Sequence, residues 1–111
     1  ARKKPMITQE AAEKALDHLR DTAESCAKAR AERLYLDEYS KSLRSILMSE
    51  HLTETLGAQE RHALSDERYL KHLEALKEAI FQDERGRFLR EAAETKVRAW
   101  QTECSNVRGN L

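Results

Sequence analysis

Histidine and cysteine are the side chains of this sequence best suited to metal binding. A di-iron site in a helical bundle requires Glu-x-x-His pairs, but the residues three positions before the four histidines are Ala15, Met48, Gln59 and Tyr69. The sequence contains no His-x-x-x-His or Cys-x-x-Cys spacing either, so a zinc site would have to be assembled from scattered residues. We therefore expect no metal and no other cofactor.

Nucleophilic catalysis has no clear signature. Cys104 could act as a nucleophile only with a histidine base close by, and nothing in the sequence places one there. A cysteine packed as a small apolar side chain is the simpler interpretation. The sequence has no Gly-rich phosphate loop and no serine elbow motif. We therefore expect that the protein is not an enzyme.

Basic side chains offer two candidate contacts for nucleic acid. One is the N-terminal arm, with Arg2, Lys3 and Lys4. The other is an arginine cluster next to Trp100, which comprises Arg85, Arg87, Arg90, Lys96 and Arg98. Arginine beside an exposed aromatic ring can stack on single-stranded bases. However, glutamates are interleaved with the cluster, and Lys+Arg and Asp+Glu balance at 20 each, whereas nucleic-acid binders usually carry a basic excess. Nucleic-acid binding is therefore an alternative and not the leading hypothesis.

The amino-acid composition indicates that most of these candidate residues lie on long helices. The 111 residues include three glycines and one proline, and 36% are charged, which is typical of long helices and coiled coils. No run approaches the roughly 18 apolar residues of a membrane span, and no apolar stretch follows the basic N-terminus as in a secretory signal. We expect an all-α cytoplasmic protein without membrane contact, in which Cys26 and Cys104 are reduced.

Two long helices are predicted, over residues 9–50 and 66–105. Ser65 is the expected N-cap of the second helix. Gly86 interrupts its apolar stripes and lowers helix stability by about 1 kcal/mol relative to alanine, so either a solvated turn within a continuous helix or a kink is expected there. The remainder of this single domain is assigned to a flexible arm (1–8), a connector with a short helix (51–65) and a frayed tail (106–111).

The near-equal lengths of the two helices favour an antiparallel hairpin of coiled-coil type. Large apolar residues occur side by side along the second helix, so its apolar surface is wider than one neighbour can cover. Association of two hairpins into a four-helix arrangement would bury this surface. We therefore expect a homodimer, with Phe81, Phe88 or Trp100 at the contact.

Residues 69–79, 90–93 and 99–102 resemble segments of small helical bacteriophage proteins. Such proteins tend to be encoded among early phage genes, near recombination and single-strand-binding functions. The resemblance covers mainly residues 66–108 and implies a bacterial cytoplasm and an accessory role in phage DNA metabolism. It points to no particular functional residue.

The leading hypothesis is therefore a non-enzymatic phage accessory protein that acts through protein–protein interaction, in phage DNA recombination or replication. One alternative is a nucleic-acid-binding accessory protein that uses the basic arm and the arginine cluster. Another is an inhibitor of a host enzyme or defence protein, which has the same sequence features as the leading hypothesis.

Overall fold

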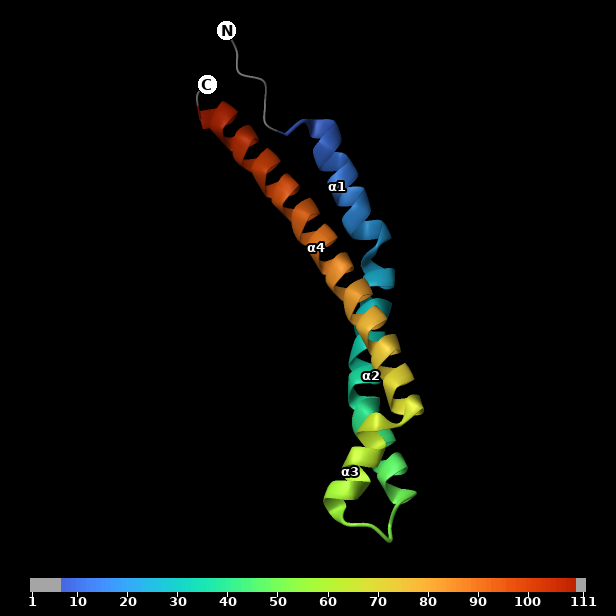
Figure 1. Cartoon of the computed structure of the whole chain (residues 1–111). Helices are drawn as coiled ribbons and strands as arrows, with labels where there is room; N and C mark the ends of the chain where they lie inside the picture. Colours follow the sequence, from blue (N-terminus) through green and yellow to red (C-terminus); the bar gives the residue numbers. More distant parts are fainter. Residues whose placement is uncertain (1–6, 110–111) are drawn as a thin grey trace. The chain divides into compact units, whose positions relative to one another are not determined.

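The computed structural model describes residues 7–109, and nearly all of them are helical (Figure 1). Four helices follow one another: α1 (Gln9–Asp21), α2 (Ala23–Ser49), α3 (Leu56–Ser65) and α4 (Glu67–Gly109). The described residues form no β-strand, so the all-α class is confirmed. None of these helices has a stretch long and apolar enough to cross a membrane.

The first long helix expected from the sequence is divided at Thr22, which lies between α1 and α2. The Thr22 hydroxyl donates to the carbonyl of His18 at 2.6 Å, and the Thr22 amide donates to the same oxygen at 3.0 Å. From α4, Arg90 Nη1 donates to the carbonyl of Leu19 at 2.9 Å, which an uninterrupted helix would pair with the amide of Ala23. Side-chain donors thus compete with the helical backbone at this point.

Asp66, and not Ser65, caps the start of α4. The backbone of Asp66 is extended, with φ −66° and ψ 138°, and its Oδ1 accepts from the amide of Arg68 at 2.8 Å. The Ser65 hydroxyl instead donates to the carbonyl of Arg61 in α3, at 2.7 Å. The physical reason is that a charged carboxylate is a stronger acceptor than a hydroxyl at the positive end of the helix dipole.

The α4 helix passes through Gly86 without interruption and ends at Gly109, beyond the expected end at residue 105. A Cβ atom added to Gly86 would lie 3.2 Å from the Sγ of Cys26 and 4.0 Å from its Cβ. The first distance is shorter than ordinary van der Waals contact. Glycine is therefore explained at this position by the close approach of Cys26 to the backbone of α4.

The chain forms two compact units. Unit 1 combines the chain up to Cys26 with the chain from Arg85 onward, and unit 2 comprises Ala27–Glu84. In both units, part of α4 contacts an earlier helix of the chain.

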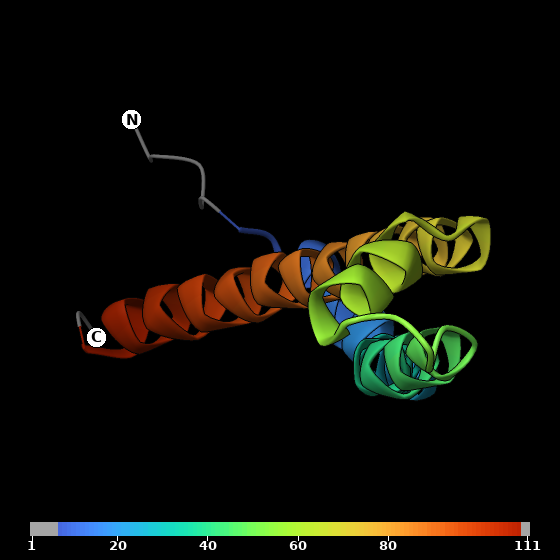
Figure 2. The ribbon, with the colours of Figure 1, turned by 60° about the horizontal axis from the view of Figure 1, so that its bottom comes forward.

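Unit 2 has a small core at the end of α2. Leu43 and Leu47 from α2 pack against Ala63 from α3, and Met48 and Tyr69 lie against this cluster. Figure 2 shows the turn that leads from the end of α2 into α3 at this end of the unit. The core fixes α3 because Ala63 is fully buried.

Polar contacts join α2 to the first part of α4 within unit 2. The buried His72 shares a hydrogen bond of 2.7 Å with the hydroxyl of Ser40. Further along, Arg33 Nη1 donates to Asp83 at 3.1 Å and to Glu84 at 2.9 Å. These hydrogen bonds raise the pKa of Arg33. The charges on this part of the helix pair are thus matched across the contact.

In unit 1, α1 lies beside the last part of α4 (Figure 1). The buried hydrophobic residues on both sides are alanines, namely Ala12, Ala15 and Ala93. This contact therefore buries little apolar side-chain volume. The amide of Ile7 donates to Glu103 Oε2 at 3.4 Å. Both cysteines of the chain are free thiols and half-buried.

Candidate functional site

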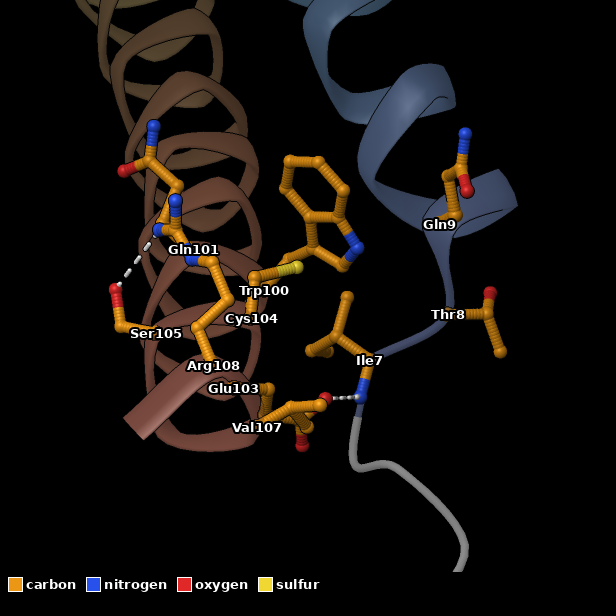
Figure 3. A pocket seen from close by; sticks show the side chains of 10 residues that line it. All are labelled: Ile7, Thr8, Gln9, Trp100, Gln101, Glu103, Cys104, Ser105, Val107 and Arg108. Carbon is orange, nitrogen blue, oxygen red and sulfur yellow. Dashed lines mark hydrogen bonds between the residues drawn. The ribbon is translucent and has the colours of Figure 1, made fainter. Parts of the chain in front are cut away.

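An open apolar pocket lies in unit 1, between the start of α1 and the last turns of α4 (Figure 3). Its volume is about 920 Å³. The residues that line it are Ile7, Thr8, Gln9, Trp100, Gln101, Glu103, Cys104, Ser105, Val107 and Arg108. Their exposed surface is mainly apolar, so the pocket can accept an apolar side chain or ligand group.

Trp100 is the largest side chain of this pocket. Its indole ring stands between α4 and the segment that leads into α1, with the sulfur of Cys104 beside it and Ile7 across from it (Figure 3). Trp100 and Cys104 are one helical turn apart and therefore share a face of α4. The pocket lining includes no histidine, so it gives the Cys104 thiol no imidazole base. The arrangement is suited to apolar contact.

The three residues expected at a self-association contact lie in different surroundings. Phe81 in unit 2 and Phe88 in unit 1 each leave 58% of their surface exposed. The guanidinium carbon of Arg87 lies 4.7 Å from the centre of the Phe88 ring. Trp100 follows Phe88 by twelve residues, which is about 120° around a helix. Phe88 and the Trp100 pocket are thus on different faces of α4.

The predicted arginine cluster is spread over more than one face of α4. Arg90 is half-buried and donates to the backbone of α1, and Arg87 forms an ion pair of 3.1 Å with a glutamate one turn further along α4. Arg98 lines a shallow hollow that also contains a glutamate. Arg85 and Arg87 point about 160° apart around the helix. The other predicted contacts with nucleic acid lie outside the described residues: Arg2, Lys3 and Lys4.

Three side chains of types that can bind a metal lie close together in unit 2. Their spacing in the sequence did not indicate this cluster. His51 and Glu54 lie in the turn after α2, and His62 lies in α3. Oε2 of Glu54 is 2.8 Å from Nε2 of His62 and 3.6 Å from Nδ1 of His51. The two imidazole rings are stacked, with centroids 4.1 Å apart and 9° between their planes. The sequence signal is a His-x-x-Glu pair, which a search for Glu-x-x-His does not find.

Arg68 organises the other carboxylates near this turn. It donates to Glu50 at 2.6 Å and to Asp66 at 2.9 Å. These hydrogen bonds lower the pKa of Glu50, lower the pKa of Asp66 to about 2, and raise the pKa of Arg68. Glu54, by contrast, contacts both histidines through its Oε2.

No family model matches the sequence, and comparisons with curated proteins and with solved structures gave no significant match.

Proposed function

We propose that this protein is not an enzyme, that it acts through protein–protein contact, and that it associates with a second copy of itself. The observation that carries the proposal is the imbalance between buried and exposed apolar side chains. All but two of the buried hydrophobic residues in the described range are alanines, and Leu47 is the largest fully buried side chain. Many larger apolar side chains, Phe81 and Phe88 among them, are exposed.

Burial of such side chains is worth a large share of the stability of a small protein. Full burial of one large apolar side chain contributes about 1.5–3 kcal/mol, whereas a whole domain is stable by about 5–15 kcal/mol. In unit 2, Tyr35, Tyr39 and Ile46 are exposed and fall within about 40° of one another around α2. Large exposed apolar surfaces mark protein interaction sites, and one face of α2 in unit 2 thus carries side chains suited to such a contact.

The arrangement that we infer is an antiparallel hairpin which pairs into a four-helix dimer. Within unit 2, Ser40 contacts His72, and Arg33 contacts Asp83. Position along α2 thus decreases as position along α4 increases, and unit 1 follows the same rule from Leu19–Arg90 to Ile7–Glu103. These opposed directions support the hairpin. Two-fold pairing would let the same exposed surfaces of both copies cover each other.

The Trp100 pocket is the proposed anchor of the contact in unit 1. Tryptophan is enriched among the residues that contribute most to protein interfaces, and here it lines an open apolar hollow together with Cys104 and Val107. Phe88 supplies a second, separate contact on another face of α4. A partner that covers both faces would exclude water from the apolar surface that the chain itself leaves open.

The biological setting that we propose is the one implied by the resemblance to small phage proteins, namely an accessory role in phage DNA recombination or replication in the bacterial cytoplasm. An inhibitor of a host enzyme or defence protein would use the same apolar surfaces. The nucleic-acid alternative has less support, because its arginines are spread over more than one face of α4, and Arg87 and Arg90 are engaged by other groups of the chain.

The experiment is sedimentation equilibrium at micromolar concentration. We expect the wild type to show twice the chain mass of 12.8 kDa, and Trp100→Glu and Phe88→Glu to shift towards the monomer. Asn106→Glu is the matched control, because Asn106 is exposed on the same helix and does not line the pocket. A wild-type chain that stays a fully helical monomer over the whole concentration range would overturn the proposal.

A further inference from the structure

We propose that His51, Glu54 and His62 form a binding site for a divalent transition-metal ion, with Zn²⁺ as the ion that fits best. The site lies in unit 2, within the connector between α2 and α4. Two imidazoles and one carboxylate are a ligand set that zinc uses where a fourth position is kept for water or another ligand. Calcium and magnesium fit less well because they prefer oxygen ligands.

The two distances from Glu54 to the histidines are close to those between the ligands of a tetrahedral ion. With bonds of about 2.0–2.1 Å, neighbouring ligands of zinc are about 3.3 Å apart. The two distances from Glu54 Oε2 are 2.8 Å to His62 and 3.6 Å to His51, on either side of this value. All three ligand atoms lie within 4.8 Å of one another. The two imidazole planes are only 9° apart, and a ring nitrogen binds an ion in the plane of its own ring, so at least one ring must turn for both nitrogens to bind the same ion.

The backbone holds the three ligands on short, anchored segments. The amide of Glu54 donates to the carbonyl of His51 at 3.0 Å, which fixes the spacing of these two residues in the turn. The hydroxyl of Thr55 caps the first turn of α3 at 3.3 Å. Ala63, which follows His62, is fully buried in the core of unit 2. The turn and α3 thus present the ligands from fixed positions, as metal sites require.

A simple ion pair accounts for only part of this arrangement. The short contact between His62 and Glu54 would form without a metal, and the stacking of the two rings also holds His51 nearby, but neither contact by itself requires two imidazole nitrogens to lie near the same carboxylate oxygen. The side chains of His62 and Glu54 are 47% and 41% exposed, so a fourth ligand can reach the ion from solvent. A bound ion would join the turn after α2 to α3 and so stabilise this end of unit 2.

The experiment is isothermal titration calorimetry of the reduced full-length chain with Zn²⁺ in a non-chelating buffer. We expect one ion per chain, and an affinity lower by at least about tenfold in His62→Gln and in Glu54→Gln. The matched control is His18→Gln, which alters a histidine of α1 and should leave the affinity unchanged. At a hundredfold excess over the dissociation constant, Zn²⁺ should raise the unfolding midpoint of the wild type by about 10 °C.

A second measurement on the wild type does not depend on how the variants fold. Co²⁺ in place of Zn²⁺ should give visible absorption bands of a nitrogen and oxygen site, without the thiolate charge-transfer band that binding by Cys26 or Cys104 would produce. A thiolate band, the absence of saturable binding, one ion per two chains, or unchanged affinity in His62→Gln would each overturn the proposal.

Discussion

Replacement of Gly86 by alanine tests whether close packing against Cys26 explains this glycine. Alanine is more favourable than glycine in a helix interior by about 1 kcal/mol. The added Cβ would lie 3.2 Å from the Cys26 sulfur, and overpacking of a tight contact costs about 1 kcal/mol or more. We expect the two effects nearly to offset each other, so that the free energy of unfolding changes by less than about 0.5 kcal/mol.

The variant Cys26→Ala separates the two effects. It removes the sulfur and keeps the Cβ, which lies 4.0 Å from the added atom, an ordinary contact distance. In this background, Gly86→Ala should stabilise the protein by about 1 kcal/mol, which is a coupling of about 1 kcal/mol in a double-mutant cycle. Urea unfolding followed by far-ultraviolet circular dichroism measures all four proteins, provided that the denaturant slope stays constant.

Equal effects of Gly86→Ala in the two backgrounds would refute the steric explanation. Destabilisation in both would show that the backbone of α4 needs glycine for another reason, such as a bend. Gly57→Ala is the control, because a Cβ at Gly57 would have no neighbour within 4 Å. Its effect should therefore be independent of residue 26.

Three further predictions concern stability. Leu47→Ala should lower the free energy of unfolding by about 2–5 kcal/mol, because Leu47 is 1% exposed. Leu52 is 74% exposed, so Leu52→Ala should change that free energy by less than about 0.5 kcal/mol. Urea unfolding measures both effects. The pKa of Asp66 is lowered from 3.8 to about 2 by Arg68, so the contribution of this pair to stability is present above about pH 4 and is lost as the pH falls towards 2. Between about pH 4 and pH 2 the thermal midpoint of Arg68→Gln should therefore fall less than that of the wild type. Equal falls in the two proteins would contradict the pairing. Arg90→Met should lower the free energy of unfolding by about 1 kcal/mol. It should also slow hydrogen exchange of the Ala23 amide, because the carbonyl of Leu19, to which Arg90 donates, becomes available to that amide.

The helical content could be predicted from the sequence because its causes are local. Few glycines and prolines, apolar stripes and caps such as Thr8, whose hydroxyl accepts from the amide of Ala11 at 3.1 Å, all act within a few residues. The division at Thr22 could not be predicted in the same way. Besides the local bond of the Thr22 hydroxyl, it involves a donor from Arg90, which is 68 residues away from Thr22 along the chain, and hydrophobic periodicity carries no information about such a partner.

The candidate sites depend still more on the folded chain. Trp100 could be selected by residue type, but its pocket exists only where Ile7 meets the last turns of α4. The cluster around Glu54 is formed by a turn and a short helix whose relative position is set by burial of Ala63. The spacing motifs searched for require ligands at fixed intervals along the sequence, whereas these ligands come from a turn and a helix that folding brings together.

The two units differ in how far apart their contacting residues are along the chain. Ile7 and Glu103, which meet in unit 1, are 96 residues apart, whereas in unit 2 Ser40 and His72 are 32 apart. The entropy lost on closing a loop grows with its length, so contacts in unit 2 form first during folding. Once they have formed, the loop that must still close to join Ile7 and Glu103 is shorter than the 96 residues that separate them along the chain. A substitution confined to the core of unit 2 should therefore slow the folding of unit 1, although it touches none of the contacts there.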